Sequence, residues 1–347
     1  MRAALAAPAV VGARATGTVT VIAYDGFIPP GFKKQFEAET GIEVRIRLAD
    51  SQAPELNLLI AERPHPLADI ATVAANRLHQ FSDAQLLSKL DVGRLTNWKL
   101  IDPLYTGSDW IKVNGDTMGV PLVVGAERLV TNTDKVPAPD SWGILFDPKY
   151  RRKITYVIED TLQQTMLYQG ADGTFASYVG KPEAAARAVD AARDTLIRNK
   201  SLVLKFYEDG AELQQMLLNE DVYVAQAYAG TPAKLILVGQ PIRTTIPKEG
   251  STAVVYNFSI LKNGANQDNA YRFLDALLGA RDIGAALSRS AGYTNTFING
   301  SDALTDAEKR AFLLTESELR RLRFLSYEGQ KLSSALIDRA VEQVKAA

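Results

Sequence analysis

The sequence predicts an α/β protein built as two lobes, and three observations support this prediction. Apolar, β-branched runs typical of buried strands alternate along the chain with stretches of helical periodicity. The length of 347 residues is enough for two ordinary domains with complete cores. No repeat and no Pro- or Ser-rich linker divides the sequence, so we expect strands that cross between the lobes to join them.

The first part of the chain has the pattern of a βαβ unit. The strand at 19–23 is apolar and β-branched, which indicates burial on both faces and implies a parallel sheet. A helix opens at Pro29-Pro30-Gly31 and ends at Gly41, where a left-handed backbone conformation is common. A second strand follows at 42–48 and a third near 69–73. The loops after the first and third strands carry Tyr24-Asp25-Gly26-Phe27 and Asn76-Arg77.

The remaining elements repeat this alternation. We expect strands at 122–132, 153–157, 222–227, 242–246 and 254–260, and helices at 162–169, 182–199, 211–219 and 268–278. The last helix is predicted to have Asp268 as its N-cap. In open α/β sheets, ligands bind beyond the carboxyl ends of the strands, so the loops at Tyr24 and Asn76 are candidate binding loops.

The overall composition restricts the partners. Thirty-nine basic and forty acidic residues give a net charge of −1, which provides no field for a nucleic-acid backbone or an anionic membrane, so a small molecule is expected instead. The absence of cysteine excludes disulfides, thiolate nucleophiles and Cys-based metal sites.

The first fifteen residues have the features of an export signal. Met1-Arg2 precedes the small and apolar run 3–12, and Ala13-Arg14-Ala15 has a small-x-small pattern. We interpret residues 1–15 as the remnant of a Sec-type signal peptide cleaved after Ala15; the alternative is an N-terminal tail. No other stretch reaches the ~18–20 apolar residues of a membrane span, so we expect a soluble, exported chain.

Several motifs carry a resemblance to a known family. They are Phe27-Ile28-Pro29-Pro30-Gly31-Phe32, Met118-Gly119-Val120-Pro121 leading to Gly125, Ser141-Trp142-Gly143-Ile144-Leu145-Phe146-Asp147-Pro148, Ala229-Gly230-Thr231, Pro247-Lys248-Glu249-Gly250 and Gly292-Tyr293-Thr294. In this order and spacing, from about Val19 to Thr296, the chain resembles the family-1 extracellular solute-binding proteins, and among them the spermidine/putrescine-binding proteins.

The resemblance implies a two-lobed periplasmic-binding-protein fold (Venus-flytrap, type II) that closes on its ligand. One lobe would hold 18–126 and 257–300, the other 127–256 and 301–347, with crossings near Arg128 and Tyr256. It also implies a monomeric periplasmic protein that delivers a small solute to an ABC permease in the inner membrane and catalyses no reaction. No cofactor and no metal ion are expected.

The resemblance also implies a ligand site of carboxylates and aromatic rings, which suit ammonium groups and methylene chains. Only part of that site is matched here. The residues expected to bind ligand are Tyr24, Asp25, Phe27, Asn76, Arg77, Glu159, Tyr228, Tyr256 and Tyr293. Asp25 stands beside a family acid position occupied by Gly26, the second acid of the ligand helix falls on Leu162, and the family's hinge aspartate falls on Tyr256. Three carboxylates are therefore lost and one basic residue is gained.

This count of charges narrows the ligand to a small amine-bearing solute with one cationic centre, polyamine-like or zwitterionic. Asp25 or Glu159 alone neutralises one ammonium, and an unpaired buried charge costs several kcal/mol, so full-length spermidine is disfavoured. Arg77 either binds a carboxylate or phosphonate end of the ligand or is an exposed arginine at a helix start. Glu127 and Arg128 are interpreted as a local salt bridge, with a ligand role left open, and the tyrosines either bind ligand or pack in the core.

Two rival functions remain open. An α/β enzyme is disfavoured because the sequence lacks the Gly-rich and nucleophile-elbow motifs, and neither His65 nor His79 has metal-ligand spacing. Ferric-ion binding through Tyr24, Tyr228 and Tyr256 is the alternative among binding proteins. The family's iron-binding members would imply an adjacent Tyr-Tyr pair, and this sequence contains none.

Overall fold

The computed structural model describes residues 17–49 and 52–347. The expected signal remnant, with its cleavage site after Ala15, lies outside the described residues. Within them, no helix combines the length and apolar character needed to cross a membrane.

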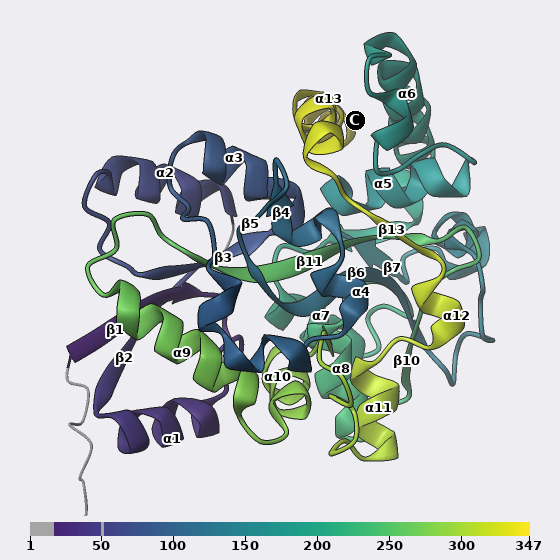
Figure 1. Cartoon of the computed structure of the whole chain (residues 1–347). Coiled ribbons are helices and arrows are strands. Elements are labelled where there is room, and N and C mark those ends of the chain that lie inside the picture. The colour runs from purple at the N-terminus through teal and green to yellow at the C-terminus, as the bar shows by residue number, and fades with distance from the viewer. Residues whose placement is uncertain (1–16, 50–51) are drawn as a thin grey trace, which may run out of the picture.

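A mixed sheet of eleven strands runs through the molecule (Figure 1). Its strands are β1 Gly17–Ala23, β2 Ile42–Leu48, β3 Ile70–Ala74, β6 Val120–Asn132, β7 Ile154–Tyr156, β8 Val203–Phe206, β9 Val224–Tyr228, β10 Ile242–Thr245, β11 Ser251–Ile260, β12 Thr294–Asn295 and β13 Leu322–Phe324. Their hydrogen-bonded order is β2-β1-β3-β11-β6-β9-β7-β8, with β10 and β12 on β6 and β13 on β11. β4 Lys112–Val113 and β5 Asp116–Thr117 form a separate hairpin.

The direction of the strands agrees with the sequence-based expectation at the two ends of this sheet and differs in the middle. β1 is parallel to β2 and β3, and β7 is parallel to β8 and β9. In contrast, β11 is antiparallel to β3 and β6, and β6 is antiparallel to β9. The expectation of a parallel sheet is wrong there because a strand buried on both faces shows the same apolar run whichever way its neighbours point.

Helices cover both faces of the sheet. They are α1 Pro30–Thr40, α2 Gln52–Glu62, α3 Leu78–Asp83, α4 Pro103–Thr106, α5 Ile158–Tyr168, α6 Pro182–Asn199, α7 Gly210–Leu218, α8 Gly230–Leu237, α9 Gln267–Gly279, α10 Ile283–Ala291, α11 Asp306–Phe312, α12 Glu316–Leu319 and α13 Tyr327–Ala346. In Figure 1, α2 and α3 lie above the β1–β3 part of the sheet and α1 and α9 lie below it, whereas α5, α6 and α13 lie together at the other end.

Two large hydrophobic cores fill the two ends. One joins β1, α1 and α9 through residues such as Phe32, Phe36 and Phe273, whose rings are 5.4–5.9 Å apart. The other surrounds Trp142 and Tyr156 and includes one face of the C-terminal α13. Each end therefore has the apolar core that a separate lobe needs.

β6 and β11 carry the chain between the two cores. Residues 120–126 of β6 pair with β11, and residues 127–131 pair with β9. β11 in turn reaches β3 through residues 256–260. Both strands change their pairing partners beside Arg128 and Tyr256, where the crossings were expected. The division into one lobe of 18–126 with 257–300 and another of 127–256 with 301–347 stays a prediction.

Two helix starts differ from the sequence-based prediction. α9 begins at Gln267 with Asn266 as its N-cap residue, so the prediction of Asp268 as N-cap is wrong. The Asp268 carboxylate instead accepts a hydrogen bond from Arg94 at 2.7 Å, and Asp69 fixes the backbone N–H of Asn266 at 2.8 Å, which sets the start of the helix earlier. α5 begins at Ile158, four residues before the predicted start, which places two acidic residues in its first turn.

Candidate functional site

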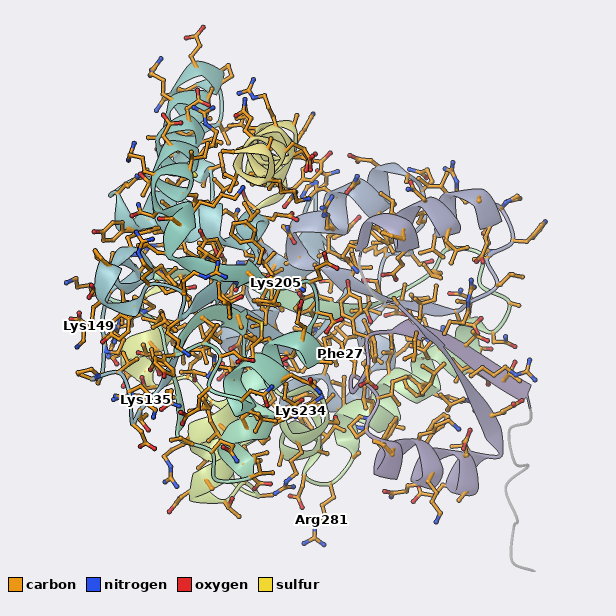
Figure 2. The ribbon with its side chains drawn as sticks, turned by 180° about the vertical axis from the view of Figure 1, so that it is seen from behind. Phe27, Lys135, Lys149, Lys205, Lys234 and Arg281 are labelled. Atoms are coloured by element: carbon orange, nitrogen blue, oxygen red, sulfur yellow. The ribbon has the colours of Figure 1, made fainter. Side chains whose placement is uncertain are left out.

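A cavity of 820 Å³ lies where β6 and β11 cross between the two cores. It is lined by all nine residues that the sequence singled out: Tyr24, Asp25, Phe27, Asn76, Arg77, Glu159, Tyr228, Tyr256 and Tyr293. They meet there because β1, β3, β7 and β9 all end at this cavity, and the loops and helices that follow these strands supply the side chains. Figure 2 shows Phe27 near the middle of the molecule, where the two halves of the ribbon meet.

One wall of the cavity is a cluster of aromatic rings. Phe27 is 1% exposed and packs edge-on against Tyr24 and Tyr256, with both ring centroids 5.5 Å away. Tyr293 joins Phe27 and Tyr256 at 6.3 Å, and Tyr228 reaches Tyr293 at 6.5 Å. Burial raises the pKa of each of the four phenols above its ordinary value, so they are neutral near pH 7. The wall therefore offers ring faces and hydroxyl groups without charge.

Gly125 of β6 makes room for this wall. A methyl group at Gly125 would lie 2.8 Å from Cε2 of Tyr256 and 3.6 Å from Cε1 of Tyr228. The two rings therefore pack against the backbone of the crossing strand, and a methyl group at this position would displace the Tyr256 ring while making an ordinary contact with Tyr228.

Tyr24 is held in place by the side chain of Gln52, a half-buried residue that also lines the cavity. The amide nitrogen of Gln52 lies 2.8 Å from the Tyr24 hydroxyl and 2.9 Å from a Glu55 carboxyl oxygen, and the Gln52 carbonyl accepts from the Ala74 N–H at 2.8 Å. Glu55 is 3% exposed, and burial raises the pKa of its carboxyl to about 8. Glu55 is consequently protonated at neutral pH and adds no negative charge beside Tyr24.

The facing wall carries acids. The first turn of α5 presents Glu159 and Asp160, and both line the cavity. Glu127 of β6 lies behind Asp160; it is 1% exposed and accepts a hydrogen bond from the side-chain amide of Gln226 on β9. The Gln226 carbonyl is itself fixed by the Val157 N–H at 3.1 Å. Burial raises the pKa of Glu127 and of Asp160, and each carboxyl is further affected by its acidic neighbours.

Arg77 stands at the cavity after β3, in the short 3₁₀ turn η1 Ala75–Arg77. The side chain is half-buried and donates to the Gln80 side chain at 3.0 Å. Its charge lowers the pKa of Glu159, opposing the larger effects of partial burial and of Asp338. None of the ion pairs between described residues includes Arg77, so its guanidinium keeps donors for a ligand.

The C-terminal helix closes another side of the cavity. The Asn76 side-chain amide donates to Gln330 of α13 at 3.0 Å, and both residues line the cavity. His79 stacks on Tyr327 of the same helix with ring centroids 4.9 Å apart. α13 therefore contacts the η1–α3 segment with its first turns while its later turns belong to the core around Trp142.

The interpretation of Glu127 and Arg128 as a local salt bridge is wrong. Neighbouring residues of a strand point to opposite faces, and Glu127 faces the acid pair while Arg128 turns away. The Arg128 guanidinium donates to the Thr244 hydroxyl at 3.2 Å and to the Phe312 carbonyl at 2.9 Å. Arg128 therefore supports packing of the segment that ends α11 and is absent from the cavity lining.

The sequence reasoning missed several residues that shape the site. They are Gln52, Asp160, Gln163 and Gln330. Asp160 could have been found from its place beside Glu159, had the start of α5 been placed at Ile158. Gln330 reaches Asn76 across 254 residues of sequence, and no local pattern marks such a contact.

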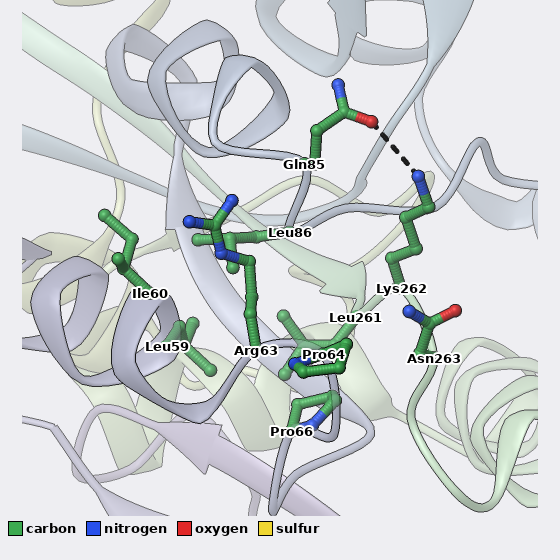
Figure 3. Close-up of a pocket in the computed structure, with 10 residues that line it drawn as sticks. All are labelled: Leu59, Ile60, Arg63, Pro64, Pro66, Gln85, Leu86, Leu261, Lys262 and Asn263. Carbon is green, nitrogen blue, oxygen red and sulfur yellow. Dashed lines mark hydrogen bonds between the residues drawn. The ribbon is translucent and has the colours of Figure 1, made fainter.

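A second hollow, of 360 Å³, lies away from this cavity, between the end of α2, the residues after α3 and the end of β11 (Figure 3). Its polar lining is basic or neutral: Arg63, Gln85, Lys262 and Asn263. Gln85 accepts a hydrogen bond from Lys262 at 3.1 Å. With no carboxylate and no aromatic ring in its lining, this hollow is unsuited to an amine.

Comparison with known proteins identifies the relatives of the chain. The family model described as bacterial extracellular solute-binding protein matches residues 32–310. A putrescine/agmatine-binding protein of Pseudomonas aeruginosa is 28% identical over 289 residues, covering 78% of this chain and 76% of the relative. The putrescine-binding periplasmic protein PotF of Escherichia coli is 26% identical over 319 residues, covering 87% and 81%.

The solved structures agree on the fold. The spermidine/putrescine ABC transporter substrate-binding protein PotD from Streptococcus pneumoniae superposes with a TM-score of 0.79 at 19% identity, covering 95% of this chain and 99% of that one. At that identity the likeness establishes the architecture alone, and it is the two-lobed architecture expected from the sequence.

Proposed function

From the premise that this chain belongs to the bacterial extracellular solute-binding protein family, we propose that it captures a small amine-bearing solute in the periplasm and delivers it to an ABC permease. The family binds solutes and the chain is accordingly a binding protein, not an enzyme. An amine is the ligand class that the cavity favours, because aromatic rings and carboxyls line the same 820 Å³ space.

The aromatic wall suits the body of an alkyl amine. Tyr24, Phe27, Tyr256 and Tyr293 present ring faces and edges that pack against methylene groups and attract a cation at short range. Because the phenols are neutral, they require no counter-ion from the ligand. Both sequence relatives described above are named for putrescine, whose four-carbon chain is the type of ligand body that such a wall accommodates.

The acids of α5 and β6 suit the ammonium group. Glu159 and Asp160 line the cavity, with Glu127 behind them, and Asp25 lies exposed at its edge. The sequence analysis predicted only Asp25 and Glu159 as carboxylates of the site. Asp160 is a further carboxyl in the cavity lining that can neutralise an ammonium group of the ligand. We propose that one ammonium binds at Glu159 and Asp160, and that Asp25 meets the second cationic end of a diamine.

Arg77 favours a second ligand class, the zwitterionic amino compounds. A guanidinium presents a fork of N–H donors that matches a carboxylate or phosphonate. Its position at the cavity lining, without an ion-pair partner among the described residues, gives an anionic ligand end a place to bind. Such a compound would set its ammonium at the acids of α5 and its anionic end at Arg77.

A thermal-shift panel of the full chain tests the proposal. Putrescine, agmatine, spermidine, amino acids, opine-like compounds and phosphonates would be compared, since a ligand at ~100 times its Kd adds about 2.7 kcal/mol to native stability. We expect stabilisation by small amines and a weaker effect of spermidine. If no amine stabilises the protein, the proposed function is refuted.

The same samples exclude or establish ferric-ion binding. Among the described residues, no three His, Cys, Asp or Glu side chains gather in a way that could hold a metal ion. The raised pKa values of Tyr228 and Tyr256 also oppose the tyrosinate form that ferric ion prefers. We expect no colour when ferric citrate is added; a red protein would overturn this.

A further inference from the structure

The acids beneath the amine-binding cavity form a pair without a cation. Glu127 of β6 and Asp160 of α5 lie close enough for each to affect the pKa of the other, and Glu127 accepts a hydrogen bond from the side-chain amide of Gln226, whose carbonyl accepts from the Val157 N–H at the start of α5. The second carboxyl oxygen of Glu127 is buried and has no hydrogen-bond partner among the described residues. None of the ion pairs between described residues includes Glu127 or Asp160. Two carboxyls that close together cannot both be ionised at low cost, so a proton must lie between them.

The side chains around Glu127 and Asp160 also favour a proton between the two carboxyls, because none of the described side chains that face the pair is basic. Those that face the pair are acids or phenols: Glu159 on α5, Tyr207 after β8, Tyr228 on β9, Tyr256 on β11 and Tyr293 before β12. The basic residues near the wall, Arg77 and Lys345, act on Glu159. Among the described residues of the site, no Lys or Arg side chain therefore neutralises Glu127 or Asp160 in place of the proton.

We propose that the Glu127–Asp160 pair is a proton-exchanging ammonium site, in which each bound ammonium displaces the shared proton into solution. This rests on the proposed function, because the displacing charge is that of an amine ligand. In the free protein Glu127 holds the proton as a carboxylic acid and donates it to the Asp160 carboxylate. In the complex the ligand keeps its own ammonium protons, the O–H bond of Glu127 breaks, and that proton leaves to solvent.

The position of the two acids explains the exchange. Asp160 lines the cavity and is the carboxyl that an entering ammonium meets, whereas Glu127 lies behind it. A positive charge within ~4–6 Å of a carboxyl strongly favours its ionised form. The ammonium therefore replaces the proton as the group that neutralises the second carboxylate.

A pH dependence with a definite sign follows. Burial and the neighbouring acid raise the pKa of Glu127 in the free protein, and the bound ammonium lowers it again. Between these two pKa values, one proton leaves per ligand, so affinity for putrescine becomes about tenfold tighter for each unit by which the pH rises. Above the free-state pKa, the affinity no longer depends on this pair.

Titration calorimetry of putrescine binding to the full chain tests the proposal. Measurements near pH 6.5 in two buffers with different heats of ionisation give the number of protons released per ligand. We expect about one proton for the wild type and none for Glu127→Gln, in which the amide has no such proton to lose. Asp69→Asn is the matched control, since Asp69 is also a buried acid but lies just before β3, outside the cavity lining; we expect it to release as many protons as the wild type.

A second measurement keeps the test independent of the variant's folding. The infrared carbonyl band of a protonated carboxyl should diminish in the wild type when putrescine binds. Binding heat without proton release, or release that persists in Glu127→Gln, would refute the exchange while leaving the proposed function intact. Failure of every amine to bind would instead refute the proposed function, and the exchange with it.

Discussion

Replacing Gly125 by alanine should weaken ligand binding at least as much as it weakens folding. The added methyl group would lie 2.8 Å from Cε2 of Tyr256, about 0.6 Å closer than the 3.4 Å at which ordinary contact begins. The backbone at Gly125 has no positive φ, so alanine is tolerated there and the strain falls on the ring. Because Tyr256 lines the 820 Å³ cavity, the ring has space to move into, and that space is where the ligand binds.

The size of the two effects follows from this geometry. A ring moved about 0.6 Å away from its favoured position costs roughly 0.5–1.5 kcal/mol in side-chain torsion, at the low end of the ~1–3 kcal/mol for overpacking a closed core. For domains of 150–250 residues, 1 kcal/mol corresponds to about 2–4 °C in Tm. The displaced ring also blocks the ligand body, so we expect putrescine affinity to fall at least tenfold, or about 1.4 kcal/mol.

Calorimetry with putrescine and thermal unfolding without ligand would measure the two effects. Gly31→Ala is the control, since Gly31 lies in α1 with nothing within 4 Å of the added methyl group. It should leave affinity unchanged. Wild-type affinity in Gly125→Ala would refute the placement of Tyr256 beside the ligand, and a Tm loss far above 4 °C would show that the ring cannot move into the cavity.

Three further predictions concern charge, motion and pH. Arg77→Ala should weaken binding of a zwitterion by roughly tenfold or more while leaving putrescine affinity nearly unchanged, since truncating one partner of a buried charged pair costs ~2–5 kcal/mol; equal losses for both ligands in calorimetry would contradict this. Ligand should reduce the radius of gyration in solution scattering if β6 and β11, which cross between the two cores, act as the predicted hinge; no compaction would contradict closure. Burial raises the pKa of Glu55 to about 8, so the folded state binds the extra proton and its stability falls as pH rises from about 4.5 to 8. Glu55→Gln should lose less Tm than the wild type between pH 5 and 8, and parallel Tm curves would contradict the assignment.

Much of the framework could be predicted from local sequence patterns. The helix end at Gly41 is confirmed, with Gly41 in the left-handed region at φ 74°. The helix expected at 182–199 is observed as α6 Pro182–Asn199, because an unbroken helical period with proline at its start leaves little choice of boundaries. The loops that follow parallel strands were also the right places to look for a cavity, since strand ends converge whatever the side chains are.

The charges of the site were harder to predict. The second acid position of the family's ligand helix was matched to Leu162, and Asp160 was therefore left out. This match depended on the predicted start of α5 at residue 162, whereas in the structure the helix begins four residues earlier. Glu127 was paired with Arg128 by proximity in sequence, although alternation along a strand separates such neighbours. Whether a buried carboxyl carries a charge depends on neighbours from β6, α5 and β9 together, and no single segment contains that information.

The place of β11 in the sheet has a consequence for how the chain is made. β3 and β6 are complete after 132 residues, but the strand that lies between them begins only at Ser251. During synthesis, the edges of β3 and β6 that face each other stay unpaired until β11 emerges, and open strand edges are sites of wrong pairing between chains. A fragment ending before Ser251 should therefore aggregate or require a chaperone, whereas the full chain closes its sheet in a late step that joins both halves at once.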